Sequence, residues 1–263
     1  SPVEDPAIYA NAFKPFTDYL ETCLDKRIVY YPVQSNAAEI EAMRSGRLHF
    51  AGFSTGPTGF AVNLAGAVPF ASKAKDGVAQ NYNLIAVVRA DSEFQTLGDL
   101  KGKRVAHTSP SSNSGNLAPI ALFPAEGLDP KTDYTPLMSG GHDKSILGLT
   151  NGDYDMIAIA DDILERMIAR GDVNAEDYRI IYTSPDFPTS SFAYSNTLAP
   201  PLAEKLQQCF LDFTYPEEMA AEFEGDNGFA AISYQEDWAI VRDVAEKTGT
   251  PYNKAAYEAE KNK

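Results

Sequence analysis

The stretch Tyr154-Asp155-Met156-Ile157-Ala158-Ile159-Ala160-Asp161-Asp162-Ile163-Leu164-Glu165-Arg166 joins two patterns that decide the fold class. Residues 154–159 form a short apolar run typical of a buried strand, and residues 161–169 carry apolar side chains at helical spacing. A buried strand that leads directly into an amphipathic helix is the repeating unit of α/β proteins. The stretch therefore predicts a strand followed by a helix that packs against the sheet.

The same alternation of strand and helix extends along most of the chain. Strands are predicted at residues 27–32, 47–53, 83–89, 104–107, 154–159, 178–183 and 192–194, and helices at 8–25, 37–43, 97–100, 117–124, 143–149, 161–169, 202–211, 216–223 and 236–247. This pattern indicates an α/β fold of two lobes with mixed, mostly parallel sheets. The helical tail after residue 200 indicates a chain that crosses to a second lobe and returns. We expect lobe 1 to comprise residues 1–85 plus 190–263 and lobe 2 residues 86–189, with hinge crossings near 85–92 and 184–191.

Composition restricts the classes of function. The chain has 263 residues, of which 44% are apolar and 22% are charged, as in an ordinary globular protein. No apolar run reaches the roughly 20 residues that span a bilayer. The formal net charge is −15, which disfavours nucleic acid and anionic membranes as partners. An anionic ligand is also repelled at long range, so an anion site has to act locally, through backbone N–H groups and a helix end.

The two cysteines, Cys23 and Cys209, lack the spacing of a metal site or a redox motif. A single disulfide, as in proteins of oxidising compartments, and two separate buried thiols both remain open, with the thiols slightly favoured. The chain starts at Ser1 without the charged and apolar regions of a signal peptide, so we expect any signal peptide to have been removed.

The segment His107-Thr108-Ser109-Pro110-Ser111-Ser112-Asn113-Ser114-Gly115-Asn116-Leu117 is the most informative candidate site. It follows a predicted strand and leads into a predicted helix, at the carboxyl end of a strand, where open α/β sheets bind ligands. The first N–H groups of a helix have no partner within it, Ser and Asn add donors, and Gly115 permits close approach to the backbone. His142, beside Gly141 at another helix start, is placed to donate to an oxyanion. An ordinary N-capped loop and a surface histidine remain the alternatives.

Catalytic and cofactor motifs are weak or absent. Gly52-Phe53-Ser54-Thr55-Gly56 matches the nucleophile elbow of α/β hydrolases and follows a predicted strand. Too few strands precede it, however, and no histidine follows His142, whereas a hydrolase places its catalytic histidine late in the chain. The same turn suits a second set of hydroxyl and N–H donors. No GxxxxGK[ST], HExxH or CxxC motif is present, so no cofactor and no metal is expected.

Taken in order, these segments resemble the periplasmic phosphate/phosphite/phosphonate-binding proteins of ABC importers, from about residue 28 to 195 and weakly to the end. The more specific part is Ser112-Asn113-Ser114-Gly115, followed by Gly141-His142. Leu97-Gly98-Asp99-Leu100-Lys101-Gly102-Lys103-Arg104-Val105 is shared with many type II binding proteins, including sulfonate binders. Further matching segments are residues 37–44, 82, 89–92, 110–119, 154–167 and 184–188.

The resemblance implies a type II periplasmic binding protein, with a central ligand cleft between two α/β lobes. Such a protein captures an anion, performs no chemistry on it and delivers it to a membrane permease. It is expected to be a monomer, either periplasmic or lipid-anchored outside the cytoplasmic membrane. The implied ligand-binding residues are Ser112, Asn113 and Ser114, which would hold phosphonyl oxygens, together with His142, Tyr82, Thr55 and Asp161.

The chain departs from the family at positions that concern the ligand. Family members that bind aminoethylphosphonate use acidic residues for its ammonium group. One of these positions falls at Ser190, and the other at Asp161 or Asp162. The loss of one acid favours phosphite, hypophosphite or a small alkylphosphonate such as methylphosphonate, and Asn113 occupies a usually Thr-like position. The alternatives are a binding protein for sulfonate or another oxyanion, and a Ser hydrolase that uses Ser54.

Overall fold

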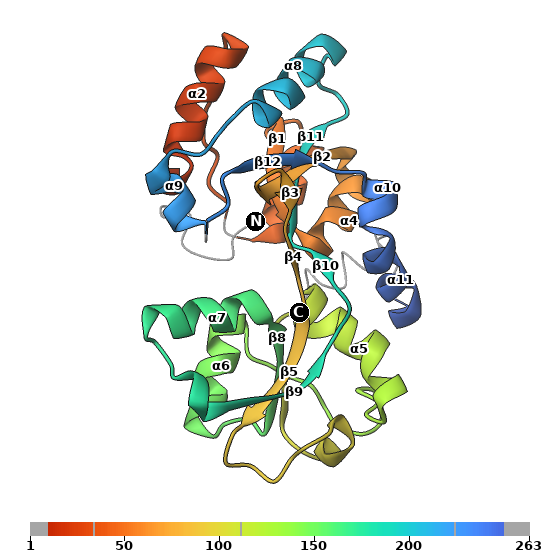
Figure 1. Cartoon of the computed structure of the whole chain (residues 1–263). Coiled ribbons are helices and arrows are strands. Elements are labelled where there is room, and N and C mark those ends of the chain that lie inside the picture. The colour runs from red at the N-terminus through yellow and green to blue at the C-terminus, as the bar shows by residue number, and fades with distance from the viewer. Residues whose placement is uncertain (1–9, 34, 111, 224, 250–263) are drawn as a thin grey trace. The chain divides into compact units, whose positions relative to one another are not determined.

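The chain forms two compact units in the computed structural model, which describes residues 10–33, 35–110, 112–223 and 225–249 (Figure 1). Of these residues, unit 1 comprises those up to 80 and those from 188 to 239, and unit 2 comprises 81–187 and those from 240 onward. The chain thus changes unit after residues 80, 187 and 239, whereas the sequence analysis placed two changes, near 85–92 and 184–191. No helix of the described residues is both long and apolar enough to cross a membrane.

Unit 1 is built on an antiparallel sheet. In spatial order its strands are β1 (Phe50–Ser54), β11 (Ser190–Ser195), β2 (Ala67–Lys75) and β12 (Gly228–Ala231), with β3 (Val78–Ala79) beside β2. The described pairings of this sheet are all antiparallel, rather than mostly parallel as expected. The physical reason is that β11 and β12 come from the C-terminal part of the chain and enter the sheet against the direction of β1 and β2.

Aromatic side chains fill the core of unit 1. They lie between the sheet and α2 (Lys14–Leu24), α8 (Pro200–Leu211) and α9 (Glu217–Glu222). Phe16 of α2 and Phe70 of β2 both meet Phe210 of α8 edge-on, with ring centroids 4.6 and 4.8 Å apart. Such pairs add about 0.5–1.5 kcal/mol to the burial of the rings. The remaining helices of the unit are α3 (Asn36–Arg44), α4 (Thr55–Ala65) and α10 (Tyr234–Asp237).

Residues 27–32, expected to form a strand, pair with no strand in the structure. The prediction rested on the β-branched and aromatic side chains of Ile28, Val29, Tyr30 and Tyr31. Of these, Val29 is 66% exposed, so it contributes little to a core. The run therefore lies between α2 and α3 without joining a sheet, and its composition alone was a misleading signal.

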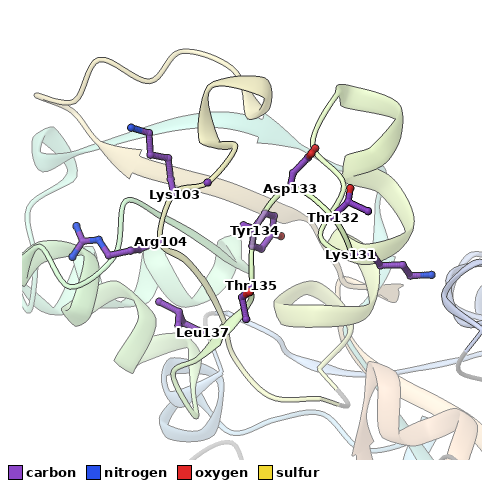
Figure 2. A pocket seen from close by; sticks show the side chains of 9 residues that line it. Lys103, Arg104, Lys131, Thr132, Asp133, Tyr134, Thr135 and Leu137 are labelled. Atoms are coloured by element: carbon purple, nitrogen blue, oxygen red, sulfur yellow. The ribbon is translucent and has the colours of Figure 1, made fainter.

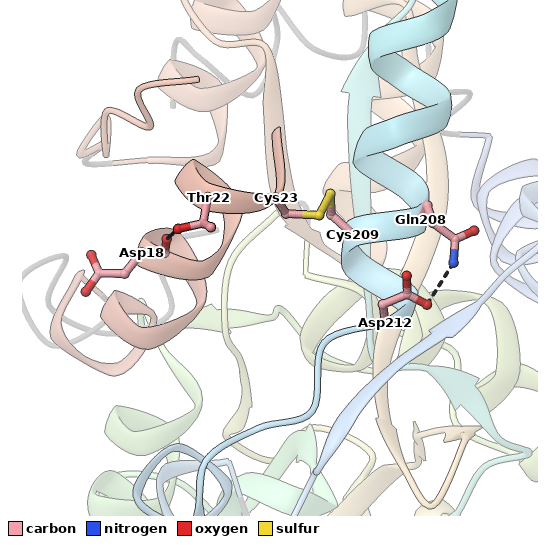
Figure 3. The surroundings of a disulfide bond; sticks show 6 residues. All are labelled: Asp18, Thr22, Cys23, Gln208, Cys209 and Asp212. Carbon is pink, nitrogen blue, oxygen red and sulfur yellow. Dashed lines mark hydrogen bonds between the residues drawn. A yellow bond between two sulfur atoms is a disulfide. The ribbon is translucent and has the colours of Figure 1, made fainter. Parts of the chain in front are cut away.

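Cys23 of α2 and Cys209 of α8 form a disulfide (Figure 3). The slight preference for two separate thiols was therefore wrong. The two Cα atoms lie 6.1 Å apart although 186 positions separate the residues in the sequence. The pairing follows from the packing of α2 and α8 against the same aromatic core, which the sequence spacing could not show.

We expect the disulfide to contribute about 2–5 kcal/mol to the free energy of unfolding, because it restricts a long loop in the unfolded chain. Urea unfolding of oxidised and reduced protein, followed by the fluorescence of the buried Trp238, measures the difference. The double variant Cys23→Ala/Cys209→Ala is the control, since reductant should not change its unfolding curve. Coincident curves for the oxidised and reduced wild type would contradict the expectation.

Unit 2 is built on a mixed sheet. In spatial order its strands are β7 (Leu137–Met138), β6 (Val105–His107), β8 (Met156–Ala160), β5 (Leu84–Arg89) and β9 (Tyr178–Thr183). β6 runs parallel to β7 and β8, while β5 runs antiparallel to β8 and β9. Every residue of β8 is buried, as the apolar run at residues 154–159 predicted.

Helices cover both faces of this sheet. Figure 1 shows α6 (His142–Asn151) and α7 (Asp161–Arg170) on one side and α5 (Ala118–Leu122) on the other. The shorter elements of the unit are β4 (Asn81–Tyr82), η1 (Leu97–Leu100), η2 (Asn113–Leu117), η3 (Phe123–Glu126) and η4 (Ala175–Asp177). Two further elements lie where the chain changes unit. β10 (Phe187–Pro188) begins in unit 2 and ends in unit 1, and α11 (Ala239–Thr248) lies in unit 2 except for its first residue. Because β6, β7 and β8 are parallel, the segments that follow them emerge at one edge of the sheet. That edge carries the predicted site.

Candidate anion-binding site

The anion loop, residues 108–110 and 112–117, follows β6 and ends in a π-helical turn, η2, that continues into α5. The helical chain thus begins at Asn113, four positions before the predicted start at Leu117. Ser112 is the N-cap, and its Oγ accepts the backbone N–H of Gly115 at 3.1 Å. Isolated π-helical turns are rare and occur frequently at functional sites, because they redirect side chains that a regular helix would carry away.

Gly115 is required by a close approach inside the protein. An added Cβ at this position would lie 1.8 Å from Oγ1 of Thr108 and 2.7 Å from Oγ of Ser112. The sequence analysis predicted that this glycine lets a ligand approach the backbone closely. In the structure, the room it leaves is taken up by the Thr108 side chain, which is 1% exposed.

His142, the first residue of α6, is held in one tautomer. Its Nδ1 accepts the backbone N–H of Ala160 at 3.1 Å, so in the neutral ring the proton is on Nε2. Burial of the ring lowers the pKa of His142 to about 4. Two smaller effects oppose each other, since Asp143 raises this pKa and Arg166 lowers it. The imidazole is therefore neutral at pH 7 and presents Nε2–H as a donor.

Ser112 and His142 lie side by side. Oγ of Ser112 and Nε2 of His142 are 3.4 Å apart. Since Nε2 carries the proton, Oγ of Ser112 accepts from both His142 and the N–H of Gly115, and its own O–H remains to donate. The 3.4 Å separation is long for a hydrogen bond, so the imidazole N–H is also able to turn to a closer acceptor. The pair forms a two-donor site for an oxyanion.

Asn113 connects the loop to Tyr82 of β4. Its Nδ2 donates to Oη of Tyr82 at 3.0 Å, and both side chains are buried. The ring of Tyr82 packs against that of Phe187, with centroids 6.0 Å apart. Ser114, the next residue of the loop, is 2% exposed. Ser112, Asn113 and Ser114 thus lie in one loop. Ser112 contacts His142, and Asn113 contacts Tyr82.

Asp161 stands at the start of α7 and holds backbone. Its Oδ1 accepts the N–H of Asn83 and that of Asp162, both at 2.9 Å. The carboxylate therefore ties α7 to the residue after Tyr82. Asp162 instead pairs with Arg166 one turn along, at 3.6 Å. A contact of Asp161 with ligand stays a prediction.

Thr55 belongs to unit 1, where it is the first residue of α4 and is 4% exposed. Its Oγ1 donates to the carbonyl oxygens of Pro188 and Thr189, at 2.8 and 3.0 Å. Its own carbonyl oxygen accepts the indole N–H of Trp238 at 3.1 Å. The single hydroxyl proton of Thr55 is thus already used within unit 1, and a role in ligand binding stays a prediction.

His107 has a structural role, in which it supports the anion loop. Its Nδ1 and Nε2 lie 2.8 Å from Oδ1 of Asn116 and from Oη of Tyr134, respectively. Nδ2 of Asn116 in turn donates to the carbonyl of Pro110 at 2.8 Å. Because Asn116 offers its oxygen, Nδ1 of His107 carries the proton and Nε2 accepts from Tyr134. This chain of hydrogen bonds fixes both ends of the loop.

A separate cavity of about 460 Å³ opens at the amino end of β6, opposite the anion loop (Figure 2). Its lining includes Lys103, Arg104 and Tyr134. Of the three cations that line it, Arg104 pairs with Asp155 at 2.7 Å, Lys103 lies over the ring of Phe94, and the ammonium of Lys131 makes no ion pair with a described residue. Among the described residues, no cluster of three or more His, Cys, Asp or Glu is arranged to hold a metal.

Comparison with known proteins identifies the family. The sequence profile described as "ABC transporter, phosphonate, periplasmic substrate-binding protein" matches residues 1–238. The chain belongs to this family. It is 27% identical over 253 residues to the phosphate-import protein PhnD of Mycolicibacterium smegmatis, covering 91% of this chain and 78% of that protein.

Two of the solved structures that share the fold match nearly the whole chain. One is a binding protein component of an ABC phosphonate transporter from Pseudomonas aeruginosa, with a TM-score of 0.79 and 19% identity, covering 99% of this chain and 92% of that one. The other is PhnD1 of Prochlorococcus marinus in complex with methylphosphonate, with a TM-score of 0.79 and 18% identity, covering 94% and 96%. The chain therefore has the α/β type II periplasmic binding protein fold.

As a solute-binding protein of an ABC transporter, the family member is not an enzyme, and the Ser hydrolase alternative is wrong. The structure shows why Ser54 gave a misleading signal. It ends β1, which pairs antiparallel with β11, whereas the elbow of α/β hydrolases follows a strand within a mostly parallel sheet. The histidine of the same unit, His49, is exposed at the other end of β1.

The neutral state of His107 predicts a pH dependence of stability. Burial lowers the pKa of folded His107 to about 4, whereas the unfolded side chain keeps its usual value near 6.5. Between pH 6.5 and 4 only the unfolded state takes up this proton. The contribution of neutral His107 to the free energy of unfolding is therefore complete above pH 6.5 and is lost as the pH falls to 4. Its size is about 3 kcal/mol.

We therefore expect the unfolding free energy of the wild type to fall by about 3 kcal/mol more than that of His107→Gln between these two pH values. Urea unfolding at a series of pH values measures this difference. His49→Gln, which replaces an exposed histidine, should follow the wild type. Parallel curves for the wild type and His107→Gln would show that the folded side chain takes up its proton freely.

Proposed function

We propose that the protein captures a reduced phosphorus oxyanion, phosphite or hypophosphite, or a small alkylphosphonate such as methylphosphonate, and delivers it to the permease of an ABC importer. The ligand-binding residues in this proposal are those of the sequence analysis: Ser112, Asn113, Ser114, His142, Tyr82, Thr55 and Asp161. The observation that carries the proposal is the Ser112–His142 pair, in which Nδ1 of His142 is occupied by Ala160 N–H and two proton donors remain for an oxyanion.

The donors of this pair suit the proposed ligands. They are uncharged, so they bind an oxyanion through hydrogen bonds of about 1.5–3 kcal/mol each to the charged ligand. The methylphosphonate bound to the Prochlorococcus marinus relative supports a small phosphorus anion. Ser190, at the position where an ammonium group would need an acid, supports a ligand without an amine.

Discrimination against phosphate would come from the group that differs. A P–H or P–CH₃ group neither donates nor accepts a hydrogen bond, so an apolar wall next to it costs nothing. Phosphate would place a hydroxyl against that wall, and an unpaired buried polar group costs about 1–3 kcal/mol, or roughly 5–150-fold in affinity. The Mycolicibacterium smegmatis relative is a phosphate-import protein, so the affinity for phosphate has to be measured beside that for the proposed ligands.

Isothermal titration with phosphite, hypophosphite, methylphosphonate, aminoethylphosphonate, phosphate, sulfate and taurine tests the proposal. We expect a dissociation constant of about 1 µM or lower for at least one non-aminated reduced phosphorus anion, with phosphate weaker. Preferred binding of aminoethylphosphonate would refute the interpretation of Ser190. Binding of taurine alone would support a sulfonate-binding protein, and tight binding of phosphate alone would refute the discrimination argument.

Ser112→Ala should weaken binding of the preferred anion by about 1–3 kcal/mol, because it removes a donor to the charged ligand. Titration calorimetry gives the dissociation constant, and thermal unfolding shows whether the loop remains folded without its N-cap. Ser109→Ala is the matched control, since it removes a hydroxyl from the same loop and should bind like the wild type. An unchanged dissociation constant for Ser112→Ala would remove this residue from the site.

A further inference from the structure

Asn113 carries a buried acceptor that has no partner among the described residues. Its side-chain oxygen, Oδ1, is inaccessible to water, and the residue is 3% exposed. The amide nitrogen of the same group is engaged with Oη of Tyr82. A buried carbonyl oxygen without a hydrogen bond costs about 1–3 kcal/mol, so its presence in a functional loop requires an explanation.

The groups around Asn113 differ in what they offer. Its chain neighbour Ser112 has an O–H to donate, and His142 has Nε2–H. Asp161 already accepts two backbone N–H groups at one carboxylate oxygen. The site thus offers donors at Ser112 and His142 and, at Asn113, an acceptor without a partner among the described residues.

A fully ionised oxyanion cannot satisfy this combination. All its oxygens are acceptors, so an oxygen near Oδ1 of Asn113 would meet another acceptor, without a proton between them. An anion with one remaining P–O–H matches both kinds of group. Its hydroxyl donates to Asn113, while its charged oxygens accept from Ser112 and His142.

We propose, on the basis of the function proposed above, that this site takes its ligand as the singly charged, protonated anion, with Asn113 Oδ1 as the acceptor of the P–O–H proton. Phosphite and methylphosphonate exist in this form near neutral pH. The proposal makes Asn113 a residue that determines which protonation state of the ligand binds.

The charges near the loop agree with a singly charged ligand. The titratable and charged groups on the elements packed around it are Tyr82, Arg89, His107, Tyr134, His142, Asp143, Lys144, Asp161, Asp162, Glu165, Arg166 and Arg170. Within this set Lys144 is exposed, and Arg89, Arg166 and Arg170 pair with Asp91, Asp162 and Asp172, respectively. The two histidines are neutral in the folded protein, so among the described residues no cation in direct contact with Ser112 or Asn113 offsets a second negative charge.

Proton uptake on binding tests the proposal directly. Titration calorimetry of phosphite at about pH 8.5, in buffers of different ionisation enthalpy, should show uptake of about one proton per ligand, because phosphite is then mostly doubly charged in solution. Hypophosphite, whose anion has no P–O–H group, is the matched control, and we expect it to bind more weakly and without proton uptake. Equal uptake with both ligands would assign the proton to His142 and would overturn the proposal.

A variant separates Asn113 from the rest of the loop. Asn113→Leu keeps the size of the side chain but has no acceptor, so phosphite should bind it without proton uptake. Asn151→Leu, at the exposed end of α6, should retain the uptake of the wild type. Thermal unfolding establishes that each variant is folded.

The pH dependence of the wild type provides a second measurement, which holds even where Asn113→Leu binds too weakly to titrate. The dissociation constant for phosphite should rise about tenfold per pH unit above the second pKa of the ligand. A dissociation constant that stays level or falls over this range would show that the doubly charged form binds. The amide of Asn113 would then face the ligand with its N–H groups. Absence of binding by any phosphorus anion at any pH would instead refute the proposed function.

Discussion

The anion loop depends on one constraint, which is that it buries polar side chains without charging them. Thr108, Asn113, Asn116 and His107 are all at least 94% buried, and each unmet hydrogen bond there costs about 1–3 kcal/mol. The chain from Tyr134 through His107 and Asn116 to the carbonyl of Pro110 meets most of this demand. These partners also set the direction of the protons on His107, Tyr134 and Asn116, so this part of the loop is ordered before the ligand binds.

This arrangement explains how a protein with a net charge of −15 can bind an anion. The long-range field opposes association, so affinity has to come from hydrogen bonds at short range. His142 shows the principle most clearly. The Ala160 N–H at its Nδ1 disfavours protonation there, and the low pKa keeps the ring neutral. Its contribution at pH 7 is therefore a directed N–H, which depends on position more than on charge.

The sequence predicted the parts of this fold that repeat a simple pattern. The strand and helix around Ala160 have nearly the predicted bounds, because a fully apolar run followed by helical spacing leaves few alternatives. The strand predicted at residues 27–32 is absent, since the apolar side chains of this run are largely at the surface. The Cys23–Cys209 disulfide was equally out of reach, because it depends on how α2 and α8 pack against a core formed by distant segments.

The candidate site shows the same division between local and distant information. The Ser-Asn run before a helix is a local signal, and the resemblance to a family linked it to His142, whose contact with Ser112 the structure contains. No sequence pattern reveals that Ala160 donates to that histidine, or that His107 supports the loop, since both bonds join elements that meet only in the folded sheet. Sequence reasoning thus identifies the groups that can bind. The direction of each proton, on which selectivity among similar anions depends, follows from tertiary contacts.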